Sequence, residues 1–229
     1  MPVRENNADY LSREWHPAFE EYCEAIFELQ EDDIETIRSR IAERLGVSRP
    51  AVTEMTRKLE EAEFVTVASG RLELTDSGRR LAEKVVRRHR LAERFLTDIL
   101  DLSWAESHHE AGKWEHVISE RVEAAMVRVL GDPTTCPHGN PIPGTDYHAP
   151  DAIPVGELSV GQGFSVTRIP EDLEWTPGVL EYLEEAGIVP GARATLTALS
   201  PDGTATVEVN GRRVALGVTQ AARILVVRS

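Results

Sequence analysis

Cysteine and long apolar runs are scarce in this chain of 229 residues. Its two cysteines, Cys23 and Cys136, share no close-spaced motif. They give no disulfide framework and suit a reducing compartment, so we interpret both as incidental. No uninterrupted apolar run approaches the roughly 18 residues that a membrane-spanning helix needs, and the first residues lack the basic-then-apolar order of a signal peptide. We therefore expect a cytoplasmic protein without a membrane partner.

Positive charge is also scarce overall, since the formal net charge is −14. This sum argues against a polyanionic partner, but the charge is unevenly distributed. Residues 36–90 contain 13 Lys and Arg against 8 Asp and Glu, a local balance of +5. A partner that touches one face responds to the local sign, so this segment is a candidate surface for nucleic acid.

The first part of the sequence predicts a winged helix-turn-helix. Residues 17–31 carry apolar side chains at helical spacing, and 36–46 form a second short helix that Thr36 can cap and Gly46 can end. A third helix follows a tight turn, with Ser48 as its N-cap and Pro50 in its first turn. Two strand-like runs around Gly70 then indicate a hairpin, the wing.

The recognition helix of this motif is expected over residues 49–62, where small or polar side chains can approach base edges and basic ones can meet phosphates. Arginines of the preceding helix and of the wing add attraction that is independent of sequence. An alternative is a winged helix that contacts only protein. The residues expected to contact DNA are Arg38, Ser39, Arg40, Ser48, Arg49, Pro50, Ala51, Thr53, Glu54, Arg57, Lys58 and Arg71.

The rest of the chain divides into a helical part and a β part. A long helix is predicted from Thr75, and Ser103 with Glu106 forms a capping box for the next one. After a further helix, a Pro- and Gly-rich stretch is typical of a linker, and short alternating segments with turn signals then indicate a small β-barrel. The predicted domains are a DNA-binding domain (1–83), a helical metal-binding and dimerisation domain (84–132), a linker (133–152) and a barrel (153–229).

Histidines and glutamates recur at helical spacing in the helical part. His89 and Glu93 lie four apart, and the stretch HHEAGKWEH places His108 and His116 on one helix face with Glu115 beside them. Packing of these helices would join imidazoles and carboxylates, a donor set that suits manganese(II) or iron(II) better than structural zinc. The alternative is a set of solvated helix faces.

Four sequence stretches, in this order, are specific enough to indicate a protein family: RIAERLGVSRPAVTEM, RRHRLAERFLTDIL, HHEAGKWEH and HGNPIPG. With them the chain resembles the diphtheria toxin repressor family of metal-dependent transcriptional regulators, densely over residues 19–144 and more loosely in the barrel. The resemblance implies a mainly α fold with β: an N-terminal winged helix-turn-helix, a helical dimerisation domain and a C-terminal Src-homology-like barrel. It also implies a homodimer that binds double-stranded operator DNA when iron(II) or manganese(II) is bound and represses metal-uptake genes.

Carried over by position, the resemblance implies two metal sites. His89, Glu93 and His108 match the family's ancillary site, and Glu115 and His116 match two ligands of its primary site. The full set expected to hold metal is Glu21, Glu24, His89, Glu93, His108, Gly112, Glu115 and His116.

Three of these positions depart from the family's iron-sensing branch. Glu21 stands where that branch has methionine, and Glu24 where the manganese branch has a further carboxylate. Gly112 stands where iron-type members have cysteine and manganese-type members glutamate, so only its backbone carbonyl is left as a donor. Water, His109 or a barrel carboxylate, Glu174 or Glu181, is a candidate to fill that gap.

The carboxylate at position 21 predicts manganese(II) as the effector, with an iron(II)-dependent repressor as the alternative. Zinc, cobalt, nickel or cadmium can also bind in vitro, because affinity follows the Irving-Williams order. In the recognition helix, Glu54 replaces a glutamine of the iron branch and can accept a hydrogen bond from cytosine. The sequence shows no nucleotide loop, nucleophile elbow or zinc-protease motif, so we expect no enzyme, with a hydrolytic metalloenzyme as the least favoured alternative.

Overall fold

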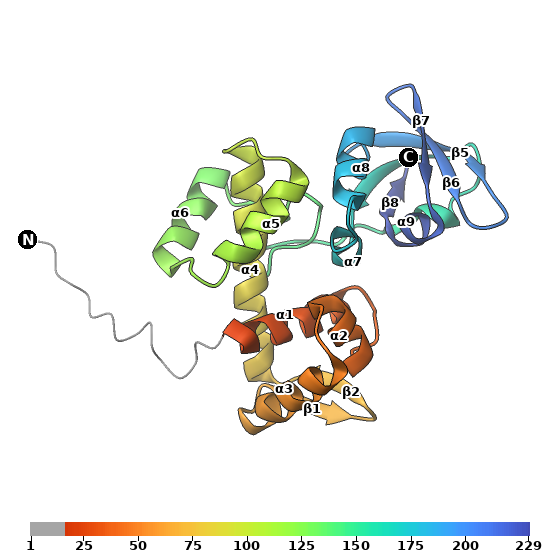
Figure 1. Cartoon of the computed structure of the whole chain (residues 1–229). Helices are drawn as coiled ribbons and strands as arrows, with labels where there is room; N and C mark the ends of the chain where they lie inside the picture. Colours follow the sequence, from red (N-terminus) through yellow and green to blue (C-terminus); the bar gives the residue numbers. More distant parts are fainter. Residues whose placement is uncertain (1–16) are drawn as a thin grey trace, which may run out of the picture. The chain divides into compact units, whose positions relative to one another are not determined.

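The computed structural model describes residues 17–229 (Figure 1). They divide into two compact units, one ending at Val85 and the other beginning at Val86. The first sixteen residues of the predicted DNA-binding domain lie outside the described part. Among the described helices, none has both the length and the apolar character needed to cross a bilayer.

The first unit contains three helices and a hairpin, as the sequence predicted. They are α1 (Pro17–Glu31), α2 (Arg38–Leu45), α3 (Arg49–Glu61), β1 (Val65–Ala68) and β2 (Arg71–Leu74). The antiparallel pair β1–β2 is the wing. Ile26, Ile41, Val52, Leu59 and Leu72 are fully buried between these elements. Burial of each such side chain contributes roughly 1.5–3 kcal/mol, so the apolar stripes of the sequence account for the core.

The turn between α2 and α3 confirms two predicted caps and corrects a third. Gly46 ends α2 with φ of 63°, and the Ser48 hydroxyl accepts a hydrogen bond from the Ala51 N–H at 3.3 Å. The predicted Thr36 cap is wrong, because Ile37 is the N-cap of α2 and no side chain caps it. Thr36 is instead buried and its carbonyl accepts the Leu72 N–H of the wing.

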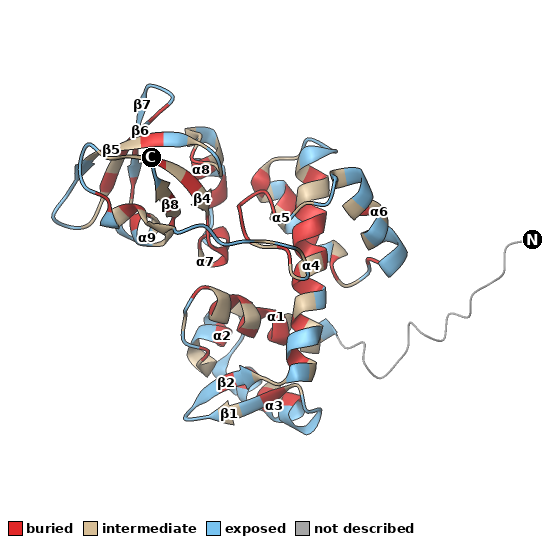
Figure 2. Cartoon of the chain, turned by 180° about the vertical axis from the view of Figure 1, so that it is seen from behind, coloured by how far each residue is buried: buried red, intermediate tan, exposed pale blue. Residues whose placement is uncertain are grey.

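Helix α4 (Asp76–Asp98) starts in the first unit and continues into the second. Its start depends on Gly78, where an added Cβ would lie 1.9 Å from the Phe64 carbonyl oxygen. Figure 2 shows the long buried middle of the helix, and residues 88–93 are all buried.

In the second unit, α5 (Trp104–Trp114) and α6 (Glu120–Leu130) share a small apolar core with the C-terminal half of α4. The capping box of α5 is present as predicted, with the Ser103 hydroxyl accepting from the Glu106 N–H and the Glu106 carboxylate accepting from the Ser103 N–H. The sequence alone therefore locates the start of the helix that carries His108.

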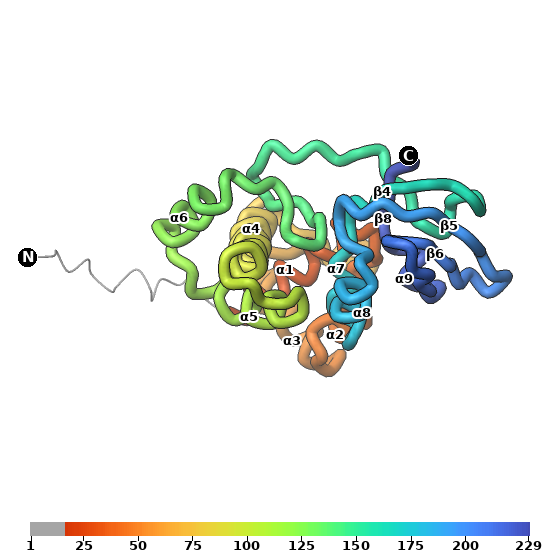
Figure 3. Tube along the Cα trace, turned by 90° about the horizontal axis from the view of Figure 1, so that it is seen from above, coloured from red at the N-terminus to blue at the C-terminus, as the bar shows by residue number. Residues whose placement is uncertain are grey.

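The segment predicted as a linker, residues 133–152, is partly a core element. Figure 3 traces it from α6 to the β-strands. Three arginines on successive turns of α4 bind its carbonyl oxygens: Arg87 to Pro143 (2.8 Å), Arg90 to Pro141 (2.5 Å) and Arg94 to Thr135 (3.1 Å). Cys136, His138, Asn140 and Ile142 are buried as a result. A composition rich in Pro and Gly cannot reveal such contacts.

The C-terminal part is a six-stranded antiparallel sheet with strand order β3-β8-β4-β5-β6-β7. Its elements are β3 (Ile153–Pro154), the 3-10 turn η2 (Val155–Glu157), β4 (Gly163–Arg168), α7 (Glu171–Glu174), α8 (Val179–Ala186), β5 (Arg193–Leu199), β6 (Ala205–Val209), β7 (Arg212–Leu216), α9 (Val218–Arg223) and β8 (Leu225–Arg228). Bulges in β4 and β5 interrupt the register. The predicted alternating segments and the helical insert are confirmed.

Asn140 ties the 133–152 segment to this β domain. Its Nδ2 donates to the Ile169 carbonyl (3.0 Å) and to Glu174 Oε1 (2.6 Å), and its Oδ1 accepts from Arg168 Nε (2.5 Å). Asn140 is fully buried, so these bonds are not shared with water. They fix α7 beside the helices.

Candidate metal centre and nucleic-acid interface

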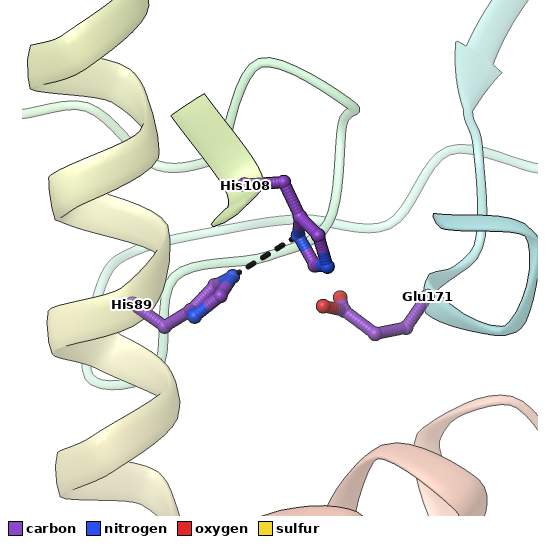
Figure 4. Close-up of side chains that lie close together, drawn as sticks. All are labelled: His89, His108 and Glu171. Carbon is purple, nitrogen blue, oxygen red and sulfur yellow. Dashed lines mark hydrogen bonds between the residues drawn. The ribbon is translucent and has the colours of Figure 1, made fainter. Parts of the chain in front are cut away.

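Helices α4 and α5 bring His89, Glu93 and His108 together. His89 and Glu93 are one helical turn apart and almost wholly buried. Glu93 Oε1 lies 3.2 Å from His89 Nε2 and 2.9 Å from His108 Nδ1, and the two imidazoles are 3.3 Å apart at His89 Nε2 and His108 Nδ1. Figure 4 shows both rings converging with the Glu171 carboxylate. The three predicted residues therefore form one cluster.

The short helix α7 supplies two carboxylates to the same cluster. Glu174 Oε2 is 3.3 Å from His108 Nδ1, while Glu171 groups with His89 and His108 as potential donors to one ion. Arg90 also pairs with Glu171, at 3.2 Å. Glu174 was one of the two barrel carboxylates considered from the sequence; the other, Glu181, is exposed on α8. Glu171 was missed, although the spacing of two acids on one turn, EDLE, was a readable signal.

Two further side chains of the cluster come from the supposed linker. His138 Nδ1 lies 2.9 Å from Glu174 Oε2 and 3.5 Å from Glu93 Oε1. Cys136 Sγ is 3.8 Å from the same nitrogen. Cys136, predicted from the sequence to be incidental, thus lies in the cluster, and His138 joins it without having been predicted. The CPH triplet was the only local signal for them.

The electrostatics of the cluster favours the protonated forms of His89 and His108 and the ionised form of Glu93. Burial alone would lower the pKa of His89, but the carboxylates of Glu93 and Glu115 outweigh it and raise that pKa well above its usual range. Burial likewise opposes the charge of His108, yet Glu174 and Glu93 raise its pKa to about 10. Burial would raise the pKa of Glu93, and the neighbouring His138 and His89 instead lower it well below its usual range.

The cluster fits a divalent cation. Within residues 17–229 several of its buried polar atoms form no hydrogen bond, among them Glu93 Oε2 and Nε2 of His108 and His138. Buried polar atoms are normally satisfied, so orphans in a group of imidazoles and carboxylates point to an ion. A cation would take the place of the imidazole protons, because histidine binds metal in its neutral form.

The residues assigned to the primary site are divided between the two units of the chain. Glu115 is buried just after α5 and lies 2.5 Å from His89 Nδ1 through Oε2, and 3.2 Å from His116 Nε2 through Oε1. Gly112 lies on α5, and a Cβ added to it would meet nothing within 4 Å. His109 is exposed. Glu21 and Glu24 lie on α1, in the first unit.

The helix-turn-helix exposes most of the side chains expected to contact DNA, whereas Arg38 and Ser39 are half-buried. Those of α3, from Arg49 to Lys58, are exposed except for the residues that face the core. Glu54 forms an ion pair with Lys58 at 2.9 Å, and the hydrogen bond from Lys58 lowers the pKa of Glu54. Arg57 pairs with Glu61 in the same way. Exposed pairs of this kind contribute little to stability and can open to a phosphate or a base edge.

Comparison with known proteins shows the same three parts. The family described as iron dependent repressor, N-terminal DNA binding domain, matches residues 15–71, its metal binding and dimerisation domain matches 75–144, and the FeoA domain matches 153–228. The iron-dependent repressor IdeR of Mycobacterium tuberculosis is 41% identical over 204 residues, covering 84% of this chain and 88% of the relative. The diphtheria toxin repressor of Corynebacterium diphtheriae is 38% identical over 207 residues, covering 86% of this chain and 91% of that repressor.

A solved structure described as a manganese-dependent transcriptional repressor in complex with manganese is also similar. It shares 36% sequence identity with a TM-score of 0.83 and covers 92% of this chain and 100% of that one. The winged helix, the buried cluster of histidines and glutamates, and the appended β domain thus define a metal-dependent transcriptional repressor. The chain belongs to the diphtheria toxin repressor family, whose members are repressors and not enzymes, and the metalloenzyme alternative is set aside.

Proposed function

We propose that this repressor binds operator DNA as a homodimer when manganese(II) is bound and thereby controls genes of metal uptake. The observation that carries the proposal is the buried group of His89, Glu93, His108 and Glu174, with its orphaned polar atoms. Oxygen and imidazole donors favour a hard or borderline divalent ion. Iron(II) in the same role is the alternative, because some relatives are described as iron-dependent.

The second metal site is proposed from the family resemblance. Glu21, Glu24, Glu115 and His116 would be its side-chain donors, with the Gly112 carbonyl. A carboxylate at position 21 in place of a methionine thioether makes this set harder and favours manganese. When bound, the metal offsets the mutual repulsion of these carboxylates and thereby favours the DNA-binding arrangement.

Dimer formation is supported by apolar side chains that the helical part leaves exposed. They are Ile99, Leu100, Val117, Val122 and Val129. In a dimer, two recognition helices would meet successive major grooves, one turn of about 34 Å or a multiple apart. Sedimentation of the protein on a duplex with one half-site and with two would test this, since a monomer that binds both with equal affinity contradicts the proposal.

The metal is tested by operator binding, measured as fluorescence anisotropy of a labelled duplex at one salt concentration. We expect manganese(II) to raise DNA affinity about thirtyfold, which corresponds to a coupling of about 2 kcal/mol, and anaerobic iron(II) to raise it less. Stronger activation by iron would favour the alternative. Binding that is indifferent to both metals would contradict the proposed function.

Two variants test the ligands. Glu21→Ala should lower metal-dependent DNA binding at least about tenfold, or about 1.4 kcal/mol, whereas Glu185→Ala, an exposed carboxylate of α8, should leave it unchanged. Gly112→Cys has open space for its side chain and should shift the preference toward iron, because a thiolate is a softer donor. An unchanged metal preference in Gly112→Cys would argue against a ligand role for this position.

A third variant tests the recognition helix. Glu54→Gln replaces a carboxylate that can accept from cytosine by an amide that suits adenine. We expect a changed operator preference at one base pair and an unchanged response to metal. A loss of affinity that is equal for all sequences would instead indicate a role of Glu54 in folding or charge.

A further inference from the structure

The inner end of the metal cluster contains a thiol and an imidazole that the proposed function does not use. Cys136 and His138 are both fully buried, and with Glu93 they form a group whose potential ligand atoms all lie within 4.8 Å of one another. Neither residue belongs to the sets proposed above. Both come from the 133–152 segment, which the arginines of α4 hold in place.

The backbone around this pair is built rigidly. The Cys136 N–H donates to the Asn140 carbonyl (2.9 Å), and the Gly139 N–H donates to the Cys136 carbonyl (3.1 Å), which closes a tight turn. Gly139 has φ of 89°, and a Cβ there would lie 2.2 Å from the Thr167 carbonyl oxygen, so only glycine fits. The turn therefore presents Cys136 and His138 to Glu93 in a fixed arrangement.

The spacing of the donor atoms matches shared coordination. A sulfur at about 2.3 Å and a nitrogen at about 2.1 Å from one tetrahedral ion lie about 3.6 Å apart. Cys136 Sγ and His138 Nδ1 are 3.8 Å apart, and His138 Nδ1 is 3.5 Å from Glu93 Oε1. Small shifts of these side chains would let all three atoms bind one ion.

The chemistry of these three buried side chains favours a bound cation. Glu93 is fully buried and its Oε2 has no hydrogen-bond partner among the described residues. This orphaned carboxylate oxygen belongs to the same side chain that faces Cys136 and His138. A buried carboxylate oxygen without a hydrogen-bond donor is costly, and a bound cation would offset this cost.

We propose that Cys136, His138 and Glu93 form an additional cation position that takes a borderline transition metal, such as zinc(II), cobalt(II) or iron(II), through a thiolate. The thiol proton leaves to solvent as the sulfur–metal bond forms. Thiolate ligands select softer ions than carboxylates do, so this position differs in selectivity from the oxygen-rich one beside it.

The position shares Glu93 with the His89 and His108 group, and thus deepens the proposed metal function without depending on which ion activates DNA binding. Glu174 contacts the imidazoles of both groups, His108 at 3.3 Å and His138 at 2.9 Å. An ion bound at His138 Nδ1 would replace the contact of this nitrogen with Glu174 and leave that carboxylate for the neighbouring ion. Loading of the two positions is therefore coupled.

The test is the absorption spectrum of the reduced, metal-free full-length protein during titration with cobalt(II) under anaerobic conditions. A thiolate ligand gives a sulfur-to-cobalt charge-transfer band in the near ultraviolet, which oxygen and nitrogen donors do not give. We expect this band in the natural protein and in Cys23→Ser, because Cys23 belongs to none of the donor groups found in residues 17–229. We expect its loss in Cys136→Ser, together with one fewer bound cobalt per chain by elemental analysis.

Circular dichroism serves as the control that each variant is folded. His138→Asn provides a second variant. It should weaken cobalt binding and shift the band while leaving the thiol in place. A natural protein that shows no charge-transfer band at saturating cobalt overturns the proposal, as does a band that survives in Cys136→Ser. If either of these results is found while metal still activates DNA binding, the additional cation position is rejected and the proposed function stands. If the band appears without metal-activated DNA binding, the additional position stands and the proposed function is rejected.

Discussion

Metal affinity should rise steeply with pH, because the cation has to displace imidazole protons. The pKa of His108 is about 10, against 6.5 for an ordinary histidine. At about 1.4 kcal/mol per pH unit, this difference means that the free energy of proton binding is more favourable in the folded protein than in the unfolded chain by roughly 5 kcal/mol. His89, whose pKa also lies well above its usual range, adds a second proton.

The expected magnitude follows from the number of protons displaced. One proton gives a tenfold change in metal affinity per pH unit, and two give a hundredfold change. Calorimetric titration of manganese(II) between about pH 6.5 and about pH 8.5, in buffers of different ionisation enthalpy, counts the released protons directly. A pH-independent affinity with no proton release would refute the assignment of His89 and His108 as protonated ligands.

The same pKa predicts the stability of the metal-free protein. A raised pKa in the folded state stabilises the fold fully below about pH 6.5, and this contribution is lost as pH rises through about 10. The melting temperature of the metal-free protein should therefore fall between neutral pH and about pH 10, and His108→Asn should show a smaller fall. An equal fall in both proteins would show that other groups are responsible.

Three substitutions test the framework around the site by thermal or urea unfolding. Asn140→Ala leaves a buried carboxylate oxygen and a buried carbonyl without their donor and should cost about 3 kcal/mol; a cost under about 1 kcal/mol would mean that water replaces the amide. Ser103→Ala removes the hydroxyl of the α5 capping box and should cost about 1 kcal/mol, with Ser159→Ala as a control of no expected effect. Gly78→Ala brings a methyl group against the Phe64 carbonyl and should destabilise the first unit by about 3 kcal/mol or more, and a neutral effect would show that α4 can shift.

Much of the fold was predictable because it follows local rules. Ser48, Gly46 and the Ser103–Glu106 pair set helix ends through bonds within a few residues, and apolar periodicity identified the core faces. Thr36 shows the limit of such rules. Its side chain satisfies the requirements of a cap, but its carbonyl binds the wing strand, a tertiary contact that starts the helix one residue later.

The metal cluster was predictable only in part, for the same reason. Helical spacing and the family resemblance together predict His89, Glu93 and His108. Glu171, Cys136 and His138 reach the cluster through long-range contacts: Arg90 binds both Pro141 and Glu171, and Asn140 binds Glu174. Nothing in the local sequence of a Pro- and Gly-rich stretch records that three arginines hold it against a helix.

The depth of the cluster limits the rate at which a bound ion can be released, and therefore the rate at which the protein can respond to a change in metal concentration. Glu93 and His138 have no exposed surface, and Glu171 has almost none. An ion at that depth leaves only when the surrounding structure opens locally, so its release is governed by an opening rate rather than by how much chelator is outside. When the metal concentration falls, such a repressor would retain bound ions for a time set by the rate of this local opening. The genes that it represses would therefore be switched on after a delay.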